Sequence, residues 1–158
     1  MSSRFQIDEV ADRLWLGPCP RTPEQIAILS RDHGVTGLVS VQTDRDLEAS
    51  GLTWSLMWRF LMARNIAATR VPVVDFEDAS LVANLDAAVA AVASMHSAGR
   101  VTYVHCSIGM NRSPTVTIAW LVAHGGLDAA QAWDQVCARR PIVQPNRSAF
   151  DAWLAQRG

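Results

Sequence analysis

The chain alternates between short runs rich in apolar residues and longer segments in which apolar residues recur at helical spacing. Runs of about four to eight apolar residues are typical of buried strands, whereas recurrence every three or four positions is typical of helices with one buried face. The short runs predict strands at 35–41, 66–74 and 101–104, and an opening hairpin from residues 5–10 and 14–16.

The longer segments predict helices, several of which have recognisable ends. Thr22 followed by Pro23 is typical of a helix N-terminus, and this helix is expected to run to about residues 33–34. Ser80 is the expected N-cap of a long helix that ends at Gly99. The polar segment 42–51 is expected only to close the strand before it. Further helices are expected at 53–65, 113–124, 129–139 and 148–156.

Strands that alternate with helices predict an α/β fold with a central, mostly parallel sheet covered by helices on both faces. A length of 158 residues suits one domain with one sizeable core, so a single domain over 1–158 is expected. Hydrophobic residues make up 49% of the chain and charged residues 18%, which excludes a disordered protein. A net charge of -1 gives no basic field, so no nucleic-acid partner is expected.

The cysteine content and the N-terminal residues predict where the protein is located and whether it holds disulfides or a metal. The first residues lack the apolar run of a signal peptide, and no stretch of about 18 apolar residues is free of charge, so a cytoplasmic protein without a membrane partner is expected. Cys19, Cys106 and Cys137 are far apart and form no CxxC pair, which predicts neither a disulfide framework nor a zinc site. No metal or cofactor is expected, and the sequence makes no prediction of oligomeric state.

The segment with the clearest chemistry is 105–113, His-Cys-Ser-Ile-Gly-Met-Asn-Arg-Ser, between a predicted strand and a predicted helix. A loop in this position points backbone N–H groups into one concave space at a helix N-terminus, which suits a phosphate dianion. Arg112 can offer its planar fork to two phosphate oxygens. The same positive field favours the thiolate of Cys106, which would attack phosphorus and form a phosphocysteine intermediate.

A cysteine after a strand is more often a buried structural thiol than a nucleophile, and Cys-x5-Arg alone arises by chance. The surrounding residues His105, Gly109 and Ser113, together with the strand-to-helix setting, favour the nucleophile. The sequence therefore predicts that Cys106 attacks phosphate and that Arg112 binds it. The residues expected to bind the substrate within the loop are Ser107, Ile108, Gly109, Met110 and Asn111.

Residues 104–114 resemble the active-site segment of the dual-specificity phosphatases, in which this loop joins the last strand to a helix. The resemblance implies that His105 orients the loop and that Ser113 assists breakdown of the phosphocysteine. An interior histidine and a helix-start hydroxyl are the alternative roles. Residues 136–146 are similar to the segment after the family's catalytic helix, so the resemblance extends from about residue 10 to the end. It implies a phosphatase active on phosphotyrosine and phosphoserine or phosphothreonine.

An alkoxide is a poor leaving group, so the reaction needs a proton donor on a separate loop. Asp75 follows the predicted strand 66–74 and lies three residues after Pro72, as the acid of the family follows its strand in a Pro-x-x-Asp sequence. Asp78 is the alternative, although a carboxylate there would also stabilise the start of the following helix. Glu77 is expected to be a solvated neighbour. The sequence therefore favours Asp75 as the general acid.

Residues 16–21, 37–46 and 73–78 are similar to the glucan phosphatases, the laforin-like group that removes phosphate from glycogen or starch. In that group aromatic residues around the cleft stack on sugars, and the matching position here is Phe76. Trp54 and Trp58 lie in the segment that corresponds to the group's recognition region, although their four-residue spacing fits core packing equally well.

Two departures oppose the glucan assignment. Ile108, Met110 and Asn111 replace the small residues and glycine usual in that group's loop, and the chain has no room for a carbohydrate-binding module. The sequence therefore favours phosphorylated proteins over phosphorylated glucan as the substrate, with the glucan as the alternative.

Other classes that share parts of this pattern fit less well. Rhodaneses also place a cysteine in a six-residue loop, but they do not require a distant acid such as Asp75. Low-molecular-weight phosphatases carry Cys-x5-Arg near the N-terminus, whereas Cys106 lies two-thirds along the chain. A non-catalytic phosphate-binding module would be expected to lack the cysteine, the arginine or the acid.

Oxidation is the remaining expectation from the cysteines. A reactive thiolate is readily converted to sulfenic acid, which a second thiol can trap as a disulfide. Cys19 is the expected partner of Cys106, because Cys137 lies on an apolar helical face where burial is expected.

Overall fold

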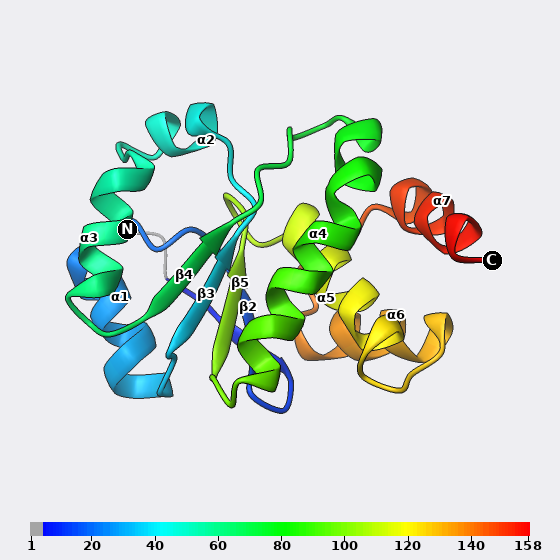
Figure 1. Cartoon of the computed structure of the whole chain (residues 1–158), viewed down its shortest axis with the longest axis horizontal. Helices are drawn as coiled ribbons and strands as arrows, with labels where there is room; N and C mark the ends of the chain where they lie inside the picture. Colours follow the sequence, from blue (N-terminus) through cyan, green and yellow to red (C-terminus); the bar gives the residue numbers. More distant parts are fainter. Residues whose placement is uncertain (1–4) are drawn as a thin grey trace.

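The computed structural model describes residues 5–158, which form one five-stranded sheet between two layers of helices (Figure 1). The strand order is β1-β2-β5-β3-β4. The first two strands form an antiparallel hairpin and the other three pairings are parallel, which confirms the predicted mostly parallel sheet. The strands are β1 (Asp8–Ala11), β2 (Leu14–Gly17), β3 (Gly37–Ser40), β4 (Ala67–Arg70) and β5 (Thr102–His105).

Helices cover both faces of this sheet, as the sequence predicts. One layer holds α1 (Pro23–Ala27), the π-helical turn η1 (Ile28–Asp32) and α3 (Trp54–Met62). The other layer holds α4 (Asp78–Ser97), α5 (Arg112–Ala123), α6 (Ala129–Arg139) and α7 (Arg147–Arg157). The short helix α2 (Asp44–Ala49) lies beyond the end of β3.

Alternate side chains of each strand enter two separate hydrophobic clusters, because successive residues of a strand point to opposite faces. Leu38 and Tyr103 belong to the cluster under α1 and α3, whereas Val39 and Val104 belong to the cluster under α4 and α5. Each face of the sheet therefore has its own buried core.

The strands also end level with one another. Gly17, Ser40 and His105, the last residues of β2, β3 and β5, are register partners, and Ser40 is also paired with Arg70 of β4. Because parallel strands place their carboxyl ends at one edge, the four loops that follow them meet there.

The long alanine-rich helix α4 packs along the sheet. By length and composition alone it could span a membrane. Its apolar residues recur at helical spacing, however, and they are buried against β3, β5 and the neighbouring helices. This is the ordinary core helix that the spacing predicts. The buried residues are Leu81, Leu85, Ala88, Val89, Val92 and Met95.

The polar segment 42–51 does more than close a strand, because it contains α2. Thr43 and Asp46 form a capping box in which the Thr43 hydroxyl accepts a hydrogen bond from the Asp46 N–H (3.2 Å) and the Asp46 carboxylate accepts one from the Thr43 N–H (2.9 Å). Two helix-terminal donors are thereby satisfied, which stabilises a helix that has few apolar residues.

Two further boundaries differ from the sequence prediction. The strand expected over 66–74 is regular only through β4, although the Val71 and Val73 N–H groups still donate to the carbonyl oxygens of Ser40 and Val41 (2.8 and 3.0 Å). The following helix begins at Asp78 and not after Ser80. The Ser80 hydroxyl instead accepts a hydrogen bond from the Val74 N–H (2.9 Å), and so holds the loop that precedes α4.

Candidate active site

The loop from Cys106 to Arg112 joins β5 to α5 at the carboxyl edge of the sheet. Gly109 has a φ of 70°, a conformation that glycine adopts without the steric cost of a Cβ. A Cβ at this position would lie 2.5–2.9 Å from backbone atoms of Gly17. Any side chain at residue 109 would therefore push the loop away from β2, and the glycine permits its tight curvature.

The carbonyl oxygens of residues 106–110 all accept hydrogen bonds from donors outside the loop. Because the C=O and the following N–H of a trans peptide point in opposite directions, the N–H groups of residues 107–111 turn towards the inside of the loop. None of these N–H groups has a protein acceptor within residues 5–158. The loop is therefore a cradle of free donors that suits an anion. The outer donors, in order, are His105 Nδ1, the Cys19 N–H, the Arg140 guanidinium for residues 108 and 109, and the Gln144 N–H.

Cys106 lies at the base of this cradle. Its side chain is 2% exposed, so the thiol is more enclosed than an exposed loop would suggest. The Cys106 Sγ is 3.1 Å from the Oγ of Ser113, in the first turn of α5. The two predicted residues are thus in direct contact.

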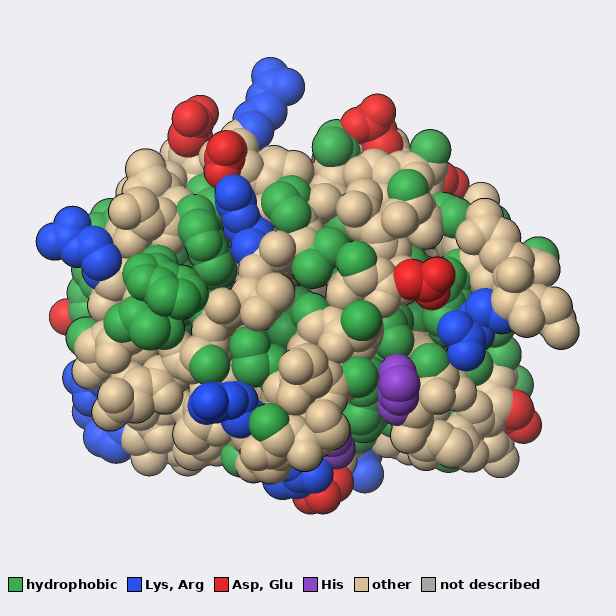
Figure 2. Space-filling view, in the orientation of Figure 1, with side chains coloured by type: hydrophobic (Ala, Val, Ile, Leu, Met, Phe, Trp, Pro, Cys, Tyr) green, Lys and Arg blue, Asp and Glu red, His purple; other side chains and the backbone are tan. Residues whose placement is uncertain are grey.

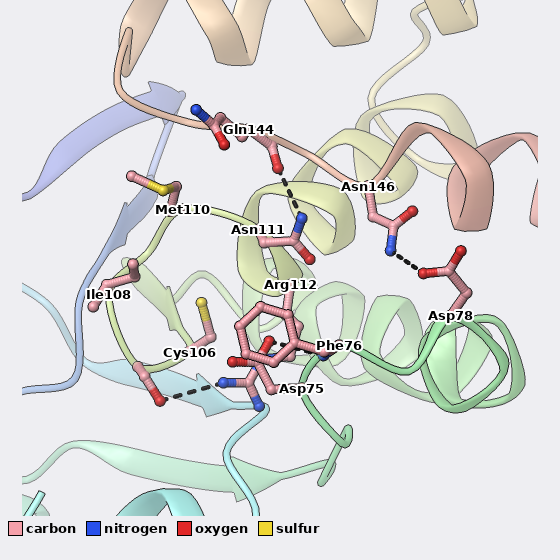
Figure 3. Close-up of a pocket in the computed structure, with 11 residues that line it drawn as sticks. Asp75, Phe76, Asp78, Cys106, Ile108, Met110, Asn111, Arg112, Gln144 and Asn146 are labelled. Carbon is pink, nitrogen blue, oxygen red and sulfur yellow. Dashed lines mark hydrogen bonds and ion pairs between the residues drawn. The ribbon is translucent and has the colours of Figure 1, made fainter.

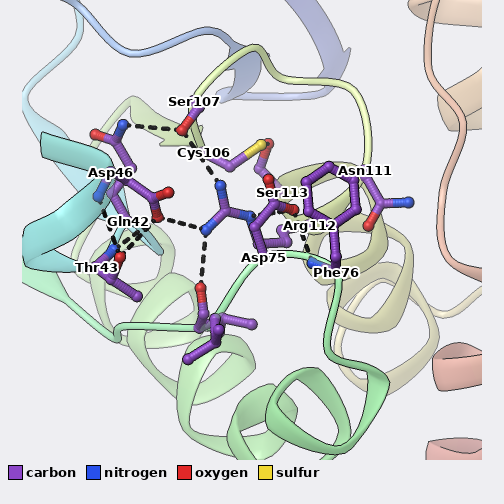
Figure 4. A network of polar contacts seen from close by, with 12 residues as sticks. Gln42, Thr43, Asp46, Asp75, Phe76, Cys106, Ser107, Asn111, Arg112 and Ser113 are labelled. Atoms are coloured by element: carbon purple, nitrogen blue, oxygen red, sulfur yellow. Dashed lines mark hydrogen bonds and ion pairs between the residues drawn. The ribbon is translucent and has the colours of Figure 1, made fainter. Parts of the chain in front are cut away.

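The guanidinium of Arg112 is buried and is held on three sides (Figure 4). Its Nη1 donates to Asp46 Oδ2 (2.7 Å) and to the carbonyl oxygen of Val73 (2.8 Å). Its Nη2 donates to Ser107 Oγ (3.2 Å), and its Nε lies 3.3 Å from Asp75 Oδ1. Two carboxylates therefore share one arginine at the wall of the cradle.

The environment of Asp46 keeps its carboxyl ionised. Burial alone would raise the pKa of Asp46, but hydrogen bonds from Arg112 and from the Thr43 N–H outweigh burial and hold the pKa below its ordinary value. Asp46 therefore supplies a fixed negative charge beside Arg112 at neutral pH.

A cavity of about 410 Å3 opens above the cradle and gathers most of the predicted site residues (Figure 3). His105, Gly109 and Ser113 do not line the cavity. No group of three or more His, Cys, Asp or Glu residues in the described part of the chain is arranged to hold a metal ion. The predicted residues that do line the cavity are Cys106, Arg112, Asp75, Phe76, Ser107, Ile108, Met110 and Asn111.

The two candidate acids occupy different positions in this cavity. Asp75 lies beside Arg112, and its carboxylate also accepts a hydrogen bond from the Phe76 N–H (3.2 Å). Asp78 accepts a short hydrogen bond from Asn146 Nδ2 (2.6 Å), on the side of the cavity away from Arg112. The geometry therefore favours Asp75 over Asp78 as a group that can reach a phosphate bound in the cradle.

The three aromatic residues considered for sugar stacking also differ in whether they line the cavity. Phe76 lines the cavity, is 97% exposed and has a φ of 62°, which is rare for a bulky residue. Trp54 and Trp58 do not line the cavity; their rings pack 6.5 Å apart on α3, and Arg70 lies over Trp54. Figure 2, in the orientation of Figure 1, shows hydrophobic side chains gathered at the left of the view, over α3. Of the three aromatics, only Phe76 is placed to contact a substrate in the cavity.

The two other cysteines are placed opposite to the expectation from sequence. Cys19 is buried, and Cys137 is only half-buried. Burial raises the pKa of Cys19 to about 11, although Arg21 opposes the shift. Cys19 packs in the cluster under α1 and α3, whereas Cys106 belongs to the cluster under α4 and α5. The Cys19 N–H nevertheless donates to the Ser107 carbonyl oxygen (3.0 Å), next to Cys106, so a disulfide between Cys19 and Cys106 stays a prediction.

His105 is fully buried beneath the loop. Burial lowers the pKa of His105 from its ordinary value of 6.5 to about 4, against the opposing hydrogen bond to the Cys106 carbonyl oxygen. The imidazole is therefore neutral at pH 7, and its Nδ1–H donates to that carbonyl oxygen (2.9 Å). Its ring also stacks on Tyr103, with ring centroids 5.9 Å apart.

This shift predicts a loss of stability in acid. The unfolded chain takes up a proton at His105 as the pH falls below 6.5, whereas the folded chain resists protonation down to about pH 4. The free energy of unfolding should therefore fall by about 3 kcal/mol across this window, measured by urea unfolding at a series of pH values.

Protonation of carboxylates also lowers the free energy of unfolding as the pH falls, over a lower part of the pH range. A matched variant is therefore needed to isolate the contribution of His105. His105→Gln should flatten the decline between pH 6.5 and 4, while a change at the exposed His124 to Gln should leave it intact. An unchanged pH dependence in His105→Gln would contradict the assignment.

Several residues of the site have no counterpart in the sequence prediction. Asp46 and Gln42 reach it from the segment after β3, and Gln42 Nε2 donates to Ser107 Oγ (3.2 Å). Arg140, 2% exposed, supports the loop from behind and pairs with Asp8. Gln144 holds Asn111 through its carbonyl oxygen (2.8 Å). The sequence offered one indication of these residues, because they lie in the segments 37–46 and 136–146 that resemble the family.

Three comparisons with known proteins agree with this geometry. Residues 15–157 match the family model described as dual specificity phosphatase, catalytic domain. Laforin of Mus musculus is 27% identical over 151 residues, which are 89% of this chain and 46% of laforin. The amyloplastic phosphoglucan phosphatase DSP4 of Castanea sativa is 30% identical over 139 residues, which are 87% of this chain and 35% of that protein.

The crystal structure of human DUSP28 superposes with a TM-score of 0.74 and 30% sequence identity, and the match covers 96% of this chain and 95% of that chain. In sequence, the chain spans about half the length, or less, of the curated relatives that it matches.

Proposed function

Because the chain belongs to the dual-specificity phosphatase catalytic-domain family, we propose that it hydrolyses phosphomonoesters with Cys106 as the nucleophile. The observation that carries the proposal is the meeting of Cys106, Arg112 and Asp75 around one cavity of about 410 Å3. The floor of this cavity offers backbone N–H groups that have no acceptor within residues 5–158. A nucleophile, an anion cradle and an acid thus surround the same space.

In the first step the phosphate group enters the cradle and takes the place of the Asp75 carboxylate on Arg112. A phosphate dianion carries more charge than a carboxylate and also receives the loop N–H bonds, so it is the stronger partner. The Cys106 sulfur then attacks phosphorus as the bond to the leaving oxygen breaks. Asp75, released from Arg112, takes up a proton from solvent and donates it to that oxygen, because an unprotonated alkoxide leaves poorly.

In the second step water attacks the phosphocysteine. Asp75, now a carboxylate, accepts the proton of the water, and the sulfur–phosphorus bond breaks. The negative charge returns to Cys106, whose sulfur is 3.1 Å from the Ser113 hydroxyl. A hydrogen bond from Ser113 stabilises this leaving thiolate. His105 contributes by holding the Cys106 carbonyl oxygen outside the cradle.

The proposed substrates are phosphorylated side chains of proteins, including phosphotyrosine as well as phosphoserine and phosphothreonine. The rim of the cavity carries two exposed apolar side chains, Phe76 and Ile108, on either side of Cys106. An aromatic ring can stack on Phe76, and shorter aliphatic side chains can pack against Ile108. This rim is adaptable enough to admit more than one phosphorylated residue type.

A phosphorylated glucan is the second candidate substrate, and it is favoured by one specific observation. Phe76 presents nearly its whole ring at the cavity, as a sugar-stacking residue requires. The chestnut relative is named a phosphoglucan phosphatase, and its match covers 87% of this chain. The tryptophans of α3 add nothing to this candidate, because neither lines the cavity.

Phosphate release from phosphotyrosine and phosphoserine peptides, compared with release from phosphorylated amylopectin at equal phosphate concentration, distinguishes the two substrates. We expect faster release from the peptides. Phe76→Ala should lower kcat/KM for the phosphotyrosine peptide roughly threefold to tenfold, since an aromatic contact contributes about 0.5–1.5 kcal/mol.

Trp58→Ala is the matched control, because Trp58 is also an exposed aromatic but lies outside the cavity. It should leave release from both substrates unchanged. Faster release from amylopectin than from any peptide would reverse the substrate assignment, and the absence of release from every substrate and from a small aryl phosphate would remove the phosphatase proposal itself.

A further inference from the structure

Asp46 enters the active site from α2, the helix that the sequence does not predict. Its side chain is 18% exposed, whereas that of Asp44, two residues earlier on the same helix, is 79% exposed. Asp44 pairs at the surface with Arg70 (2.6 Å), and Asp46 pairs with the buried Arg112 (2.7 Å). Two equal charges on one short helix therefore have different surroundings.

Asp46 and the carbonyl oxygen of Val73 together use both N–H groups of Arg112 Nη1. The groups that remain for a substrate are the Nε–H and the Nη2–H groups, which form one straight edge of the guanidinium. Two parallel N–H groups on such an edge match the spacing of two phosphate oxygens. In the free protein this edge faces Asp75 and Ser107, at the wall of the cavity.

Asp46 is itself fixed before any substrate arrives. Its Oδ2 accepts hydrogen bonds from the N–H of Thr43 (2.9 Å) and from the Thr43 hydroxyl (3.0 Å). The neighbouring Gln42 donates to Ser107 Oγ, which in turn accepts from Arg112 Nη2. One segment after β3 thus holds both ends of the guanidinium, and the capping box of α2 is continuous with the active site.

We propose that Asp46 is a positioning residue that fixes Arg112 with its Nε and Nη2 edge towards the substrate phosphate, and the proposal rests on the proposed phosphatase function. Without Asp46, Asp75 would be the only carboxylate within residues 5–158 that pairs with Arg112. The guanidinium could then turn towards Asp75, which would misplace the fork and tie up the proposed acid.

Electrostatics alone makes the opposite prediction, and this allows a sharp test. Asp46 adds negative charge near the phosphate, so removing that charge would strengthen anion binding if position did not matter. If Asp46 acts by positioning, its removal weakens turnover and the binding of transition-state mimics, because a small misplacement of a binding group is costly in rate.

The experiment compares Asp46→Asn with Asp44→Asn, which makes the same charge change on the same helix. Turnover of a small aryl phosphate, inhibition by orthovanadate and binding of tungstate are measured for both variants. We expect Asp46→Asn to lower kcat roughly 10- to 100-fold, to weaken orthovanadate inhibition by a similar factor and to weaken tungstate binding less. Asp44→Asn should stay within about twofold of the parent.

Asp46→Glu provides the rescue, because it keeps a carboxylate on α2, and it should recover part of the lost kcat. If Asp46→Asn does not fold, Asp46→Glu must fall more than about threefold below Asp44→Asn, since a displaced carboxylate misplaces the fork. Equal turnover in the Asp46 and Asp44 variants, or tighter orthovanadate binding with unchanged kcat in Asp46→Asn, overturns the proposal. An inactive parent protein would overturn the phosphatase function alone, and tungstate binding would still decide the role of Asp46.

Discussion

Replacement of Cys106 by serine is expected to lower the hydrolysis of a small aryl phosphate by roughly a thousandfold or more, since loss of a nucleophile typically costs several powers of ten. The serine hydroxyl would occupy nearly the same place beside Ser113, but it holds its proton at neutral pH and attacks phosphorus poorly. The measurement is steady-state turnover with the variant at high concentration, compared with the rate in buffer.

The same variant should still bind tungstate, because the inward N–H groups of residues 107–111 and Arg112 do not depend on the sulfur atom. Loss of turnover with retained binding separates loss of the nucleophile from loss of the fold. Cys137→Ser is the matched control, since Cys137 is half-buried on α6, and it should keep full activity. Residual activity of Cys106→Ser above about one per cent of the parent would remove Cys106 from the role of nucleophile.

The sheet and most helices could be predicted from sequence because their signals are local. The runs around Val39 and Val104 are apolar at successive positions, as strands buried on both faces require. Thr22 and Pro23 mark the start of α1 correctly, with the Thr22 hydroxyl accepting from the Gln25 N–H. The helix α2 was missed because its apolar content is low and its stability comes from a capping box that a polar segment does not reveal.

The arrangement of the loop residues could be predicted for the same reason. Cys106, Arg112 and Ser113 lie within eight consecutive residues, and a strand before them and a helix after them fix their relative positions. Asp75 lies outside this segment but follows a recognisable strand and proline. The structure brings Cys106, Arg112 and Asp75 to one cavity and places Ser113 in contact with Cys106, while their catalytic roles stay predictions.

Contacts between distant segments could not be predicted in this way. Asp46 is 66 residues from Arg112, and Arg140 is 31 residues from Gly109, so neither pairing leaves a local pattern. The face of the sheet that each of Cys19 and Cys106 enters depends on the course of the chain after β2 and β5. Such pairings follow from the strand order, which periodicity does not specify.

The replacement of Asp75 by asparagine is expected to lower kcat roughly 10²- to 10⁴-fold, the usual contribution of a general acid. Asparagine keeps the size of the side chain but cannot give up a proton to the leaving oxygen. The loss should be largest for a phosphoserine peptide, whose alkoxide is a poor leaving group, and smallest for an aryl phosphate. The measurement is kcat for a series of substrates with leaving groups of different basicity.

The structure also predicts that Asp75→Asn binds anions more tightly, although it turns over more slowly. Asp75 pairs with Arg112 Nε in the free protein, so an incoming phosphate competes with this carboxylate. Asp75→Asn removes the competitor and should bind tungstate more tightly than the parent while it turns over more slowly. Asp78→Asn is the control, because Asp78 lines the same cavity but is held by Asn146, and it should change neither property by more than about threefold. If Asp78→Asn instead loses turnover with poor leaving groups and Asp75→Asn does not, the acid is Asp78, and the contact between Asp75 and Arg112 has no part in catalysis.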